Sequence, residues 1–223
     1  MIFKLSKKRN IFPNPYYGEP DGLLAIGGDL SPERLIAAYQ MGIFPWYSFR
    51  NEWGPKWYCT LERFVIFPNE IHISHSMRTL MNSGRYRVSV DEDFDGVIRG
   101  CGTVDGRYDM DGAWLGDEII EAYTKLHDMG IVMSIDVWEG DRLVGGLYGE
   151  RFNNCFIGES MFSLVPSASK LALIHLAQLH QSLPHSLIDC QFETPHLRSM
   201  GGHFISYDEY MEILSQEGEG LKI

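Results

Sequence analysis

Apolar positions follow two different periods along this chain of 223 residues. Before about residue 130 they mostly recur every three or four residues, as in amphipathic helices, apart from an alternating stretch at residues 85–91. From residue 132 to 163 they alternate, as in strands, and an Ala- and Leu-rich helical segment follows from Ser169. The first helical segment has signals at both ends, because Ser31 is a favourable N-cap, Pro32 fits the first helical position and Gly42 is a typical stop. Patterns of this kind predict helices over residues 31–42, 74–84, 91–102 and 113–130.

The alternating part predicts three antiparallel strands within residues 132–163. Residues 139–141 and 153–154 supply the turns between them. Gly145, Gly146 and Gly149 fall inside the middle strand, where glycine usually marks a bulge or the close approach of another backbone or a ligand.

Polar groups interrupt the strand–helix–strand pattern of residues 155–197. Glu159 and Ser160 fall in the first of these strands, and Asp189 and Gln191 fall in the second. A carboxylate within an apolar run is costly to bury unless it is paired or used. Since two such strands around one helix can bring both carboxylates to one pocket, we expect the chemistry of the protein there.

The order helix, β-meander, helix, strand matches the core of an acetyltransferase-like fold, in which a mixed sheet splays open to admit an acyl donor. We therefore predict the α/β (α+β) class. Residues 11–22 are rich in Pro, Gly and aromatic residues and predict irregular chain, and residues 50–70 predict a connection between two parts. Trp46 lies in a loop fixed by proline, where it is either a core residue or a stacking platform for a nucleobase.

Composition and charge narrow the class of protein. With 44% hydrophobic and 22% charged residues the chain is typical of a globular protein, and it lacks an apolar run of membrane-spanning length. Its four cysteines are scattered without a C-x-x-C pair, which predicts reduced thiols in a cytoplasmic protein. The net charge of −11 is uneven: residues 1–90 carry 11 Lys and Arg against 7 Asp and Glu, and residues 91–223 carry 8 against 23. The first part offers phosphates a basic surface, although an uneven solvated surface explains the same counts.

Motifs for metals and common cofactors are missing. The histidines have no H-E-x-x-H spacing, and Asp105, Asp109 and Asp111 lack the closing glutamate of an EF-hand, so we predict no metal site. The glycines of the middle strand are not a G-x-G-x-x-G loop before a helix, and we predict no cofactor. A Ser-His-Asp triad stays open, although no G-x-S-x-G elbow is present.

Five separated strings together resemble the leucyl/phenylalanyl-tRNA–protein transferase family, in the same order along nearly the whole chain. They are GLLAIGGDLSPERLIAAYQMGIFPWY at 22–47, DVW with LVGGLYG at 136–149, FIGESMFS at 156–163, ASK at 168–170, and LIDCQ with PHL and GG at 187–202. The resemblance implies a bacterial, cytoplasmic enzyme of N-end rule protein degradation. Such an enzyme moves Leu, Phe or Met from aminoacyl-tRNA to the α-amino group of a protein that begins with Arg or Lys. It also implies a small N-terminal α/β domain, placed at residues 1–60, and a GNAT-like catalytic domain at residues 61–223, and we expect a monomer.

The resemblance assigns roles to particular residues. Asp189 and Gln191 are expected to hold the attacking amine and help remove its proton, and Glu159 to hold the neighbouring charge or the donor's amino group. A structural alternative pairs Asp189 with an arginine such as Arg198. The residues expected around the 3′-terminal adenosine are Trp46 and Trp114, with Tyr39 and Tyr123 nearby. The residues expected to line the aminoacyl pocket are Leu147, Phe156, Ile157, Met161, Leu173 and Ile188, and those expected to contact tRNA phosphates are Arg63, Arg78 and Arg85.

The chain departs from the family pattern at residues 57–63, at His75 and at residues 113–115 and 133–138. These changes remove one basic group and one histidine, and they bear on tRNA contact and aminoacyl preference more than on reaction type. Two alternative functions remain at this stage. One is an acetyl-CoA-dependent N-acetyltransferase, for which ASK at 168–170 offers no Gly-rich pyrophosphate loop, and the other is a non-catalytic protein that recognises N-termini.

Overall fold

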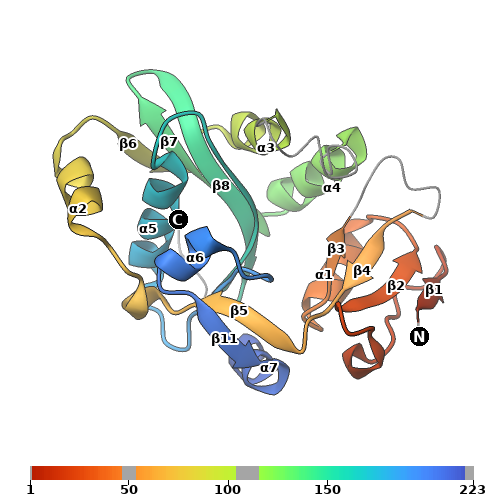
Figure 1. The fold of residues 1–223 in the computed structure, drawn as a ribbon. Coiled ribbons are helices and arrows are strands. Elements are labelled where there is room, and N and C mark those ends of the chain that lie inside the picture. The colour runs from red at the N-terminus through yellow and green to blue at the C-terminus, as the bar shows by residue number, and fades with distance from the viewer. Residues whose placement is uncertain (1, 47–53, 104–115, 219–223) are drawn as a thin grey trace.

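Two sheets of unequal size organise the protein (Figure 1). The computed structural model describes residues 2–46, 54–103 and 116–218. The small sheet has the strand order β1-β2-β4-β3 and is accompanied by the helix α1. Its elements are β1 (Phe3–Leu5), β2 (Leu23–Gly27), α1 (Pro32–Tyr39), β3 (Phe44–Trp46) and β4 (Lys56–Tyr58), and a 3-10 turn at Pro15–Tyr17 precedes β2.

The large sheet has the strand order β11-β5-β10-β9-β8-β7-β6. Strands β9 and β10 are parallel, and every other neighbouring pair in this sheet is antiparallel. The strands are β5 (Glu62–Ile66), β6 (Arg87–Val90), β7 (Val132–Glu139), β8 (Arg142–Phe152), β9 (Cys155–Ser163), β10 (Ile188–Asp189) and β11 (His203–Ser206). The predicted meander of residues 132–163 is therefore confirmed as β7, β8 and β9, and the α+β class is confirmed with it.

Helices cover both faces of the large sheet. In Figure 1, α3 and α4 lie on the side that faces the small sheet, and α2 and α5 lie on the other side. Two separate clusters of buried apolar side chains correspond to these two sides. The remaining helices are α2 (His75–Asn82), α3 (Phe94–Thr103), α4 (Asp117–Asp128), α5 (Ala168–His180), α6 (Pro195–Ser199) and α7 (Tyr207–Leu214), with a 3-10 turn at Pro68–Glu70. None of the helices in the described part of the chain is long and apolar enough to cross a membrane.

Local signals account for the helix ends. Ser74 caps α2 by accepting a hydrogen bond from the backbone of Met77, and Gly84 follows the helix with a φ of 66° that favours glycine. Ser31 precedes α1 as predicted, but its hydroxyl donates to Asp29 (2.7 Å) instead of capping the helix.

The predicted connection at residues 50–70 contains two strands, because β4 completes the small sheet and β5 enters the middle of the large one. The alternation of short apolar runs there was too brief to predict strands. The predicted domain boundary after residue 60 falls between β4 and β5, and the division into two domains stays a prediction.

A β-bulge lies in the centre of the large sheet, between β8 and β9. Tyr148 of β8 pairs with Ser160 of β9, and the next residue, Gly149, pairs with Gly158, so Glu159 is the additional residue of β9. A Cβ on Gly149 would lie 2.1 Å from the carbonyl oxygen of Ile157, so only glycine fits there. The sequence prediction that a strand glycine marks a bulge is confirmed at this position.

Strand β10 ends after two residues, whereas its parallel neighbour β9 continues to Ser163. Gln191, which was expected within that strand, lies beyond its end in a left-handed conformation with a φ of 56°. Non-glycine residues adopt this conformation seldom. The two parallel strands share only a short paired region, in which Ile188 pairs with Phe156 and Asp189 with Ile157.

Candidate active site

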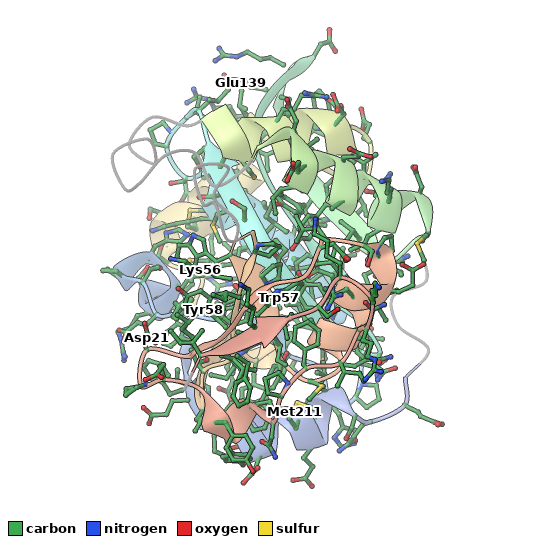
Figure 2. All side chains as sticks on the ribbon, turned by 90° about the vertical axis from the view of Figure 1, so that its right-hand side faces the viewer. Asp21, Lys56, Trp57, Tyr58, Glu139 and Met211 are labelled. Atoms are coloured by element: carbon green, nitrogen blue, oxygen red, sulfur yellow. The ribbon has the colours of Figure 1, made fainter. Side chains whose placement is uncertain are left out.

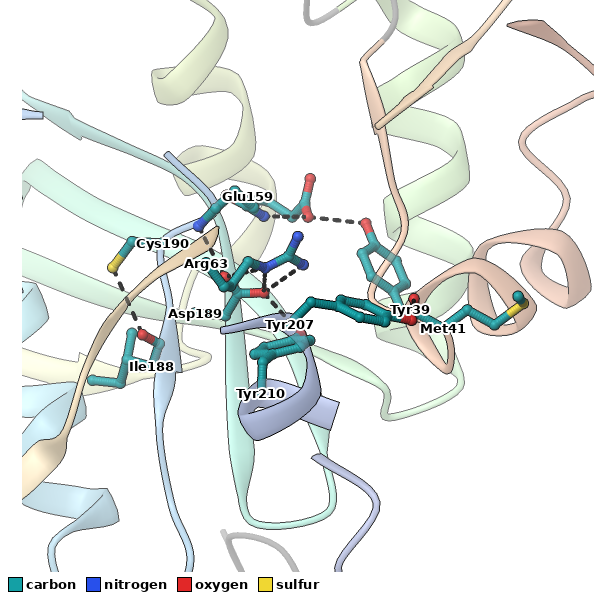
Figure 3. Close-up of polar contacts among 10 residues, drawn as sticks. Tyr39, Met41, Arg63, Glu159, Ile188, Asp189, Cys190, Tyr207 and Tyr210 are labelled. Atoms are coloured by element: carbon teal, nitrogen blue, oxygen red, sulfur yellow. Dashed lines mark hydrogen bonds and ion pairs between the residues drawn. The ribbon is translucent and has the colours of Figure 1, made fainter. Parts of the chain in front are cut away.

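Three side chains from different parts of the chain converge on the carboxylate of Glu159, and Figure 3 shows the contact with Tyr39. The hydroxyl of Tyr39 at the end of α1 donates to Oε1 (2.9 Å), and the hydroxyl of Tyr123 on α4 donates to Oε2 (2.8 Å). The side-chain amide of Gln191 donates to Oε1 (3.3 Å). The two tyrosine hydroxyl oxygens also lie 2.6 Å apart, so two hydroxyl protons are shared among three contacts.

Burial raises the pKa of Glu159 to about 7, and the hydrogen bonds from Tyr123 and Tyr39 limit that rise. The carboxyl group is therefore poised to change its charge near neutral pH. Burial also raises the pKa of both tyrosine hydroxyls well above the ordinary value, so they keep their protons and remain donors. Glu159 is half-buried, and it keeps some exposure that Tyr39 and Tyr123 lack.

Asp189 occupies a second, fully buried position on the same face of the sheet. Arg63 of β5 donates from Nε to both carboxylate oxygens (2.9 and 3.0 Å), and its Nη2 lies 2.8 Å from Oδ2 in the ion pair. The hydroxyl of Tyr210 (2.9 Å) and the backbone N–H of Gln191 (2.8 Å) complete the set of donors. The guanidinium of Arg63 also lies over the rings of Phe44 (4.8 Å) and Tyr210 (4.6 Å).

This arrangement corrects two expectations. Arg63 is 0% exposed and paired, so the prediction that it contacts a tRNA phosphate is wrong. Asp189 does pair with an arginine, as the structural alternative required, but the partner is Arg63, whereas Arg198 pairs with Glu193 on the surface. Because the carboxylate is buried and supplied with donors, Asp189 is not placed to touch an incoming amine directly; it holds the backbone of Gln191.

Gln191 connects the two acidic positions. Its backbone N–H donates to Asp189 and its side-chain amide donates to Glu159, so Gln191 links the two carboxylates through hydrogen bonds. Asp189 pairs in register with Ile157 in β9, two residues before Glu159. The expectation that adjoining strands carry both acids to one place is confirmed.

Glu150 is a third acid at this place, and the sequence interpretation missed it. It lies in β8 opposite Ile157 and is 0% exposed. Burial and the charge of Glu159 raise its pKa well above the ordinary value. The sequence signal for Glu150 is the same as that for Glu159, namely a carboxylate within a strand of mainly apolar residues.

A cluster of four rings borders the site on the side of the small sheet. Trp46 lies 5.9 Å from Tyr58 and 5.9 Å from Phe192, and Phe44 lies 5.5 Å from Phe192, between ring centroids. Side chains alternate along β4, so that Trp57 is buried while Tyr58 turns outward near Asp21 (Figure 2). Trp46 is 47% exposed, which favours the stacking-platform interpretation over the core interpretation.

The other residues expected around adenosine have different positions. Tyr39 and Tyr123 are buried and hold Glu159, a role that the sequence did not predict, and their proximity to a bound adenosine stays a prediction. Trp114 lies outside the described residues, as do Asp105, Asp109 and Asp111 of the calcium hypothesis. Among the described residues no cluster of His, Cys, Asp and Glu could hold a metal ion.

The six apolar residues proposed for the aminoacyl pocket do not share one side of the sheet. Ile157 belongs to the cluster that faces α3 and α4, because neighbouring strand residues point to opposite faces. A single pocket lined by all six is therefore wrong. The other five belong to the cluster under α5, where Met161 is the one that is half-buried: Leu147, Phe156, Met161, Leu173 and Ile188.

The two remaining arginines of the phosphate hypothesis lie on the surface around α2. Arg78 is exposed on α2, and Arg85 is exposed but pairs with Glu139 (2.8 Å). Their contact with tRNA stays a prediction. All four cysteines are free, in agreement with the expected reduced thiols.

Comparison with known proteins identifies the family. The profile described as "Leucyl/phenylalanyl-tRNA protein transferase" matches residues 65–215, and the profile of its N-terminal domain matches residues 28–61. The chain belongs to the leucyl/phenylalanyl-tRNA–protein transferase family. It is therefore a member of a family of aminoacyltransferases, as the sequence strings suggested.

Relatives named leucyl/phenylalanyl-tRNA–protein transferase align with most of the chain. The protein of Syntrophus aciditrophicus is 45% identical over 92% of this chain and 84% of its own length. That of Hydrogenovibrio crunogenus is 43% identical over 96% and 84%, and that of Thermodesulfovibrio yellowstonii is 46% identical over 92% and 83%. The transferase family thus accounts for both sheets, and the site described above lies where they meet.

Proposed function

We propose that this chain transfers a leucyl, phenylalanyl or methionyl group from aminoacyl-tRNA to the α-amino group of a protein that begins with Arg or Lys. Membership of the transferase family supports the reaction type. The observation that carries the proposal at the level of residues is the carboxylate of Glu159, held by Tyr39, Tyr123 and Gln191 at a half-buried position.

The reaction exchanges an ester for an amide. The acceptor nitrogen attacks the carbonyl carbon of the aminoacyl ester, the bond from that carbon to the ribose oxygen breaks, and the proton lost by the amine ends on the released hydroxyl. An α-amine has an ordinary pKa near 7.7–8.0, so part of it is already neutral at cellular pH. Orientation of the two reactants therefore contributes more than strong base catalysis.

Glu159 and Gln191 stand at the reacting end of the site. Glu159 in its ionised form holds the α-ammonium of the aminoacyl donor, and the side chain of Gln191 orients the attacking amine. Asp189 acts through Gln191 as a positioning residue, because its hydrogen bond to the Gln191 backbone (2.8 Å) fixes a left-handed residue beside Glu159.

The donor's other parts fit neighbouring surfaces. The adenosine is placed against the exposed ring of Trp46, with Trp114 as its second ring, and the aminoacyl side chain beside Met161, the half-buried member of its apolar cluster. Methionine adapts to Leu and Phe alike, and one methylene changes binding by only about 1–3 kcal/mol, so overlapping use of Leu, Phe and Met is expected.

The acceptor and the cell setting follow from charge and composition. Residues 91–223, with 8 basic against 23 acidic residues, favour an acceptor that begins with a cation and disfavour an acidic one. Free cysteines accord with a cytoplasmic enzyme. The family resemblance supports an enzyme that marks its acceptors for N-end rule degradation, and we propose that it acts as a monomer.

The test is a transfer assay with labelled Phe-tRNA and two peptides that differ only in the first residue, Arg or Glu, with acetyl-CoA as a parallel donor. We expect label on the Arg peptide and none from acetyl-CoA. Q191A should lower kcat by at least tenfold, whereas E121Q, at an exposed glutamate of α4, should keep the wild-type rate. Acetylation of the peptide, or binding without transfer, would instead support the acetyltransferase or the non-catalytic alternative.

A further inference from the structure

Glu150 is a buried carboxyl group without a hydrogen-bond partner. Its side chain lies on the face of the large sheet that carries Tyr148 and Ile157, beside the bulge at Glu159. It is 0% exposed, and neither carboxyl oxygen accepts a hydrogen bond from any described residue. An ionised carboxylate in such a place is strongly unfavourable, so a protonated carboxyl is the form that the interior tolerates.

The groups that face Glu150 carry no positive charge. They are Tyr39 from α1, Tyr123 from α4, Tyr148 from β8 itself and Glu159 from β9. Arg63 of β5, the buried guanidinium at this place, is committed to Asp189 of β10 and forms no ion pair with Glu150. Among these neighbours, the carboxylate of Glu159 is the one charged acceptor for the proton of Glu150.

The two glutamates titrate as a pair. Burial and the charge of Glu159 raise the pKa of Glu150 well above its ordinary value, whereas burial raises that of Glu159 to about 7. Two tyrosine hydroxyls donate to Glu159 and favour its ionised form, whereas no described residue donates to Glu150, so the proton of the pair resides on Glu150. At pH values above the pKa of Glu159, the pair then carries one negative charge.

We propose that Glu150 is a positioning residue that stays protonated and turns its O–H toward Glu159, so that Glu159 presents a single negative charge to the α-ammonium of the aminoacyl group. The inference rests on the proposed role of Glu159 and adds the group that keeps it ionised. One charge matched to one ammonium avoids the repulsion of two buried carboxylates, and it leaves the tyrosine hydroxyls free to orient Glu159.

The test compares E150Q, which keeps a neutral donor of similar shape, with E150L, which keeps the bulk but removes the donor. The measurement is kcat/KM for Phe-tRNA against pH, whose acid limb reports the group that must be ionised in the free enzyme. We expect E150Q to keep the wild-type midpoint and E150L to raise it by about half a unit to one unit, since Glu159 loses a hydrogen bond to its charged form. E121Q serves as the control and should change neither midpoint nor rate.

Two results would overturn the proposal. If Glu150 were ionised, both variants would remove a repelling charge, and both midpoints would fall. If it were only part of the packing, neither midpoint would move.

A second measurement does not depend on activity or on folding of E150L. Infrared spectra of the wild-type protein at pH 8, above the pKa of Glu159 of about 7, should contain the carbonyl stretch of a protonated carboxyl that disappears in E150Q and persists in E121Q. Its absence from wild type, or its persistence in E150Q, would also overturn the proposal. Wild-type transfer by E159Q would refute the role of Glu159 in the proposed function, and the infrared band would still locate the proton.

Discussion

Asp189 and Arg63 form an ion pair that the interior tolerates only when it is complete. Both side chains are fully buried, and the backbone N–H of Gln191 donates a hydrogen bond to the carboxylate of Asp189. Removing one partner leaves an unpaired buried charge, whereas replacing both by apolar residues of similar volume is often neutral for stability. The stability role and the catalytic role of Asp189 can therefore be separated.

We predict that D189L alone lowers the free energy of unfolding by about 3–5 kcal/mol, and that the double variant R63M/D189L recovers most of this loss. The double variant should still transfer label at least tenfold more slowly, since Gln191 has lost its backbone acceptor. Urea unfolding and single-turnover transfer measure the two effects. R198A, at the exposed pair with Glu193, is the control and should alter neither. Full recovery of transfer in the double variant would mean that Asp189 is dispensable for positioning.

At the scale of elements, the bulge between β8 and β9 contains Glu159, on the face of the sheet that Tyr39 and Tyr123 cover. Gly149 permits it, because the carbonyl of Ile157 and the ring of Phe156 occupy the space that a side chain would need. The sheet must shift locally if anything larger than glycine is placed there.

We predict that G149A destabilises the protein by about 3 kcal/mol or more, beyond the range usual for overpacking, because the obstacle is backbone. Gly140 is the matched control: it has a φ of 60° but open space around it, so G140A should cost only about 1–2 kcal/mol. Thermal unfolding of both variants provides the comparison, and equal losses would contradict the steric argument.

Sequence periodicity was sufficient for the helices and the meander because their signals are local. It predicted α1 with its proline and glycine ends, and it predicted the strand order that carries Glu159 and Asp189 together. It failed where the decisive partner is distant: Arg63 was assigned to phosphates because its partner Asp189 lies 126 residues away. The aminoacyl residues were grouped by type, and strand alternation placed Ile157 on the opposite face from the other five.

At the scale of the whole molecule, charge is divided between the two ends of the chain. Residues 1–90 are net basic, and the exposed Arg78 on α2 belongs to this part. Binding of tRNA through phosphates releases counterions, so affinity should fall steeply with salt.

We predict that R78A weakens tRNA binding and reduces the slope of log affinity against log salt by about 0.7–0.9, as expected for one lost phosphate contact. Filter binding of tRNA between low and moderate salt measures both quantities. K125A on α4 removes an exposed charge that pairs with Glu121 and is the matched control. An unchanged slope in R78A would exclude this arginine from the contact, and a flat slope in wild type would exclude phosphate binding altogether.

Tyr39 and Glu159 are 120 residues apart, and Tyr210, which binds Asp189, comes 21 residues later than its acceptor. A nascent chain released before α7 would thus possess the rings and the acidic pair but would lack the hydroxyl that completes the Asp189 anchor. Truncated products of interrupted synthesis should consequently be inactive in aminoacyl transfer from tRNA. Full transfer activity should arise only when synthesis has passed Tyr210.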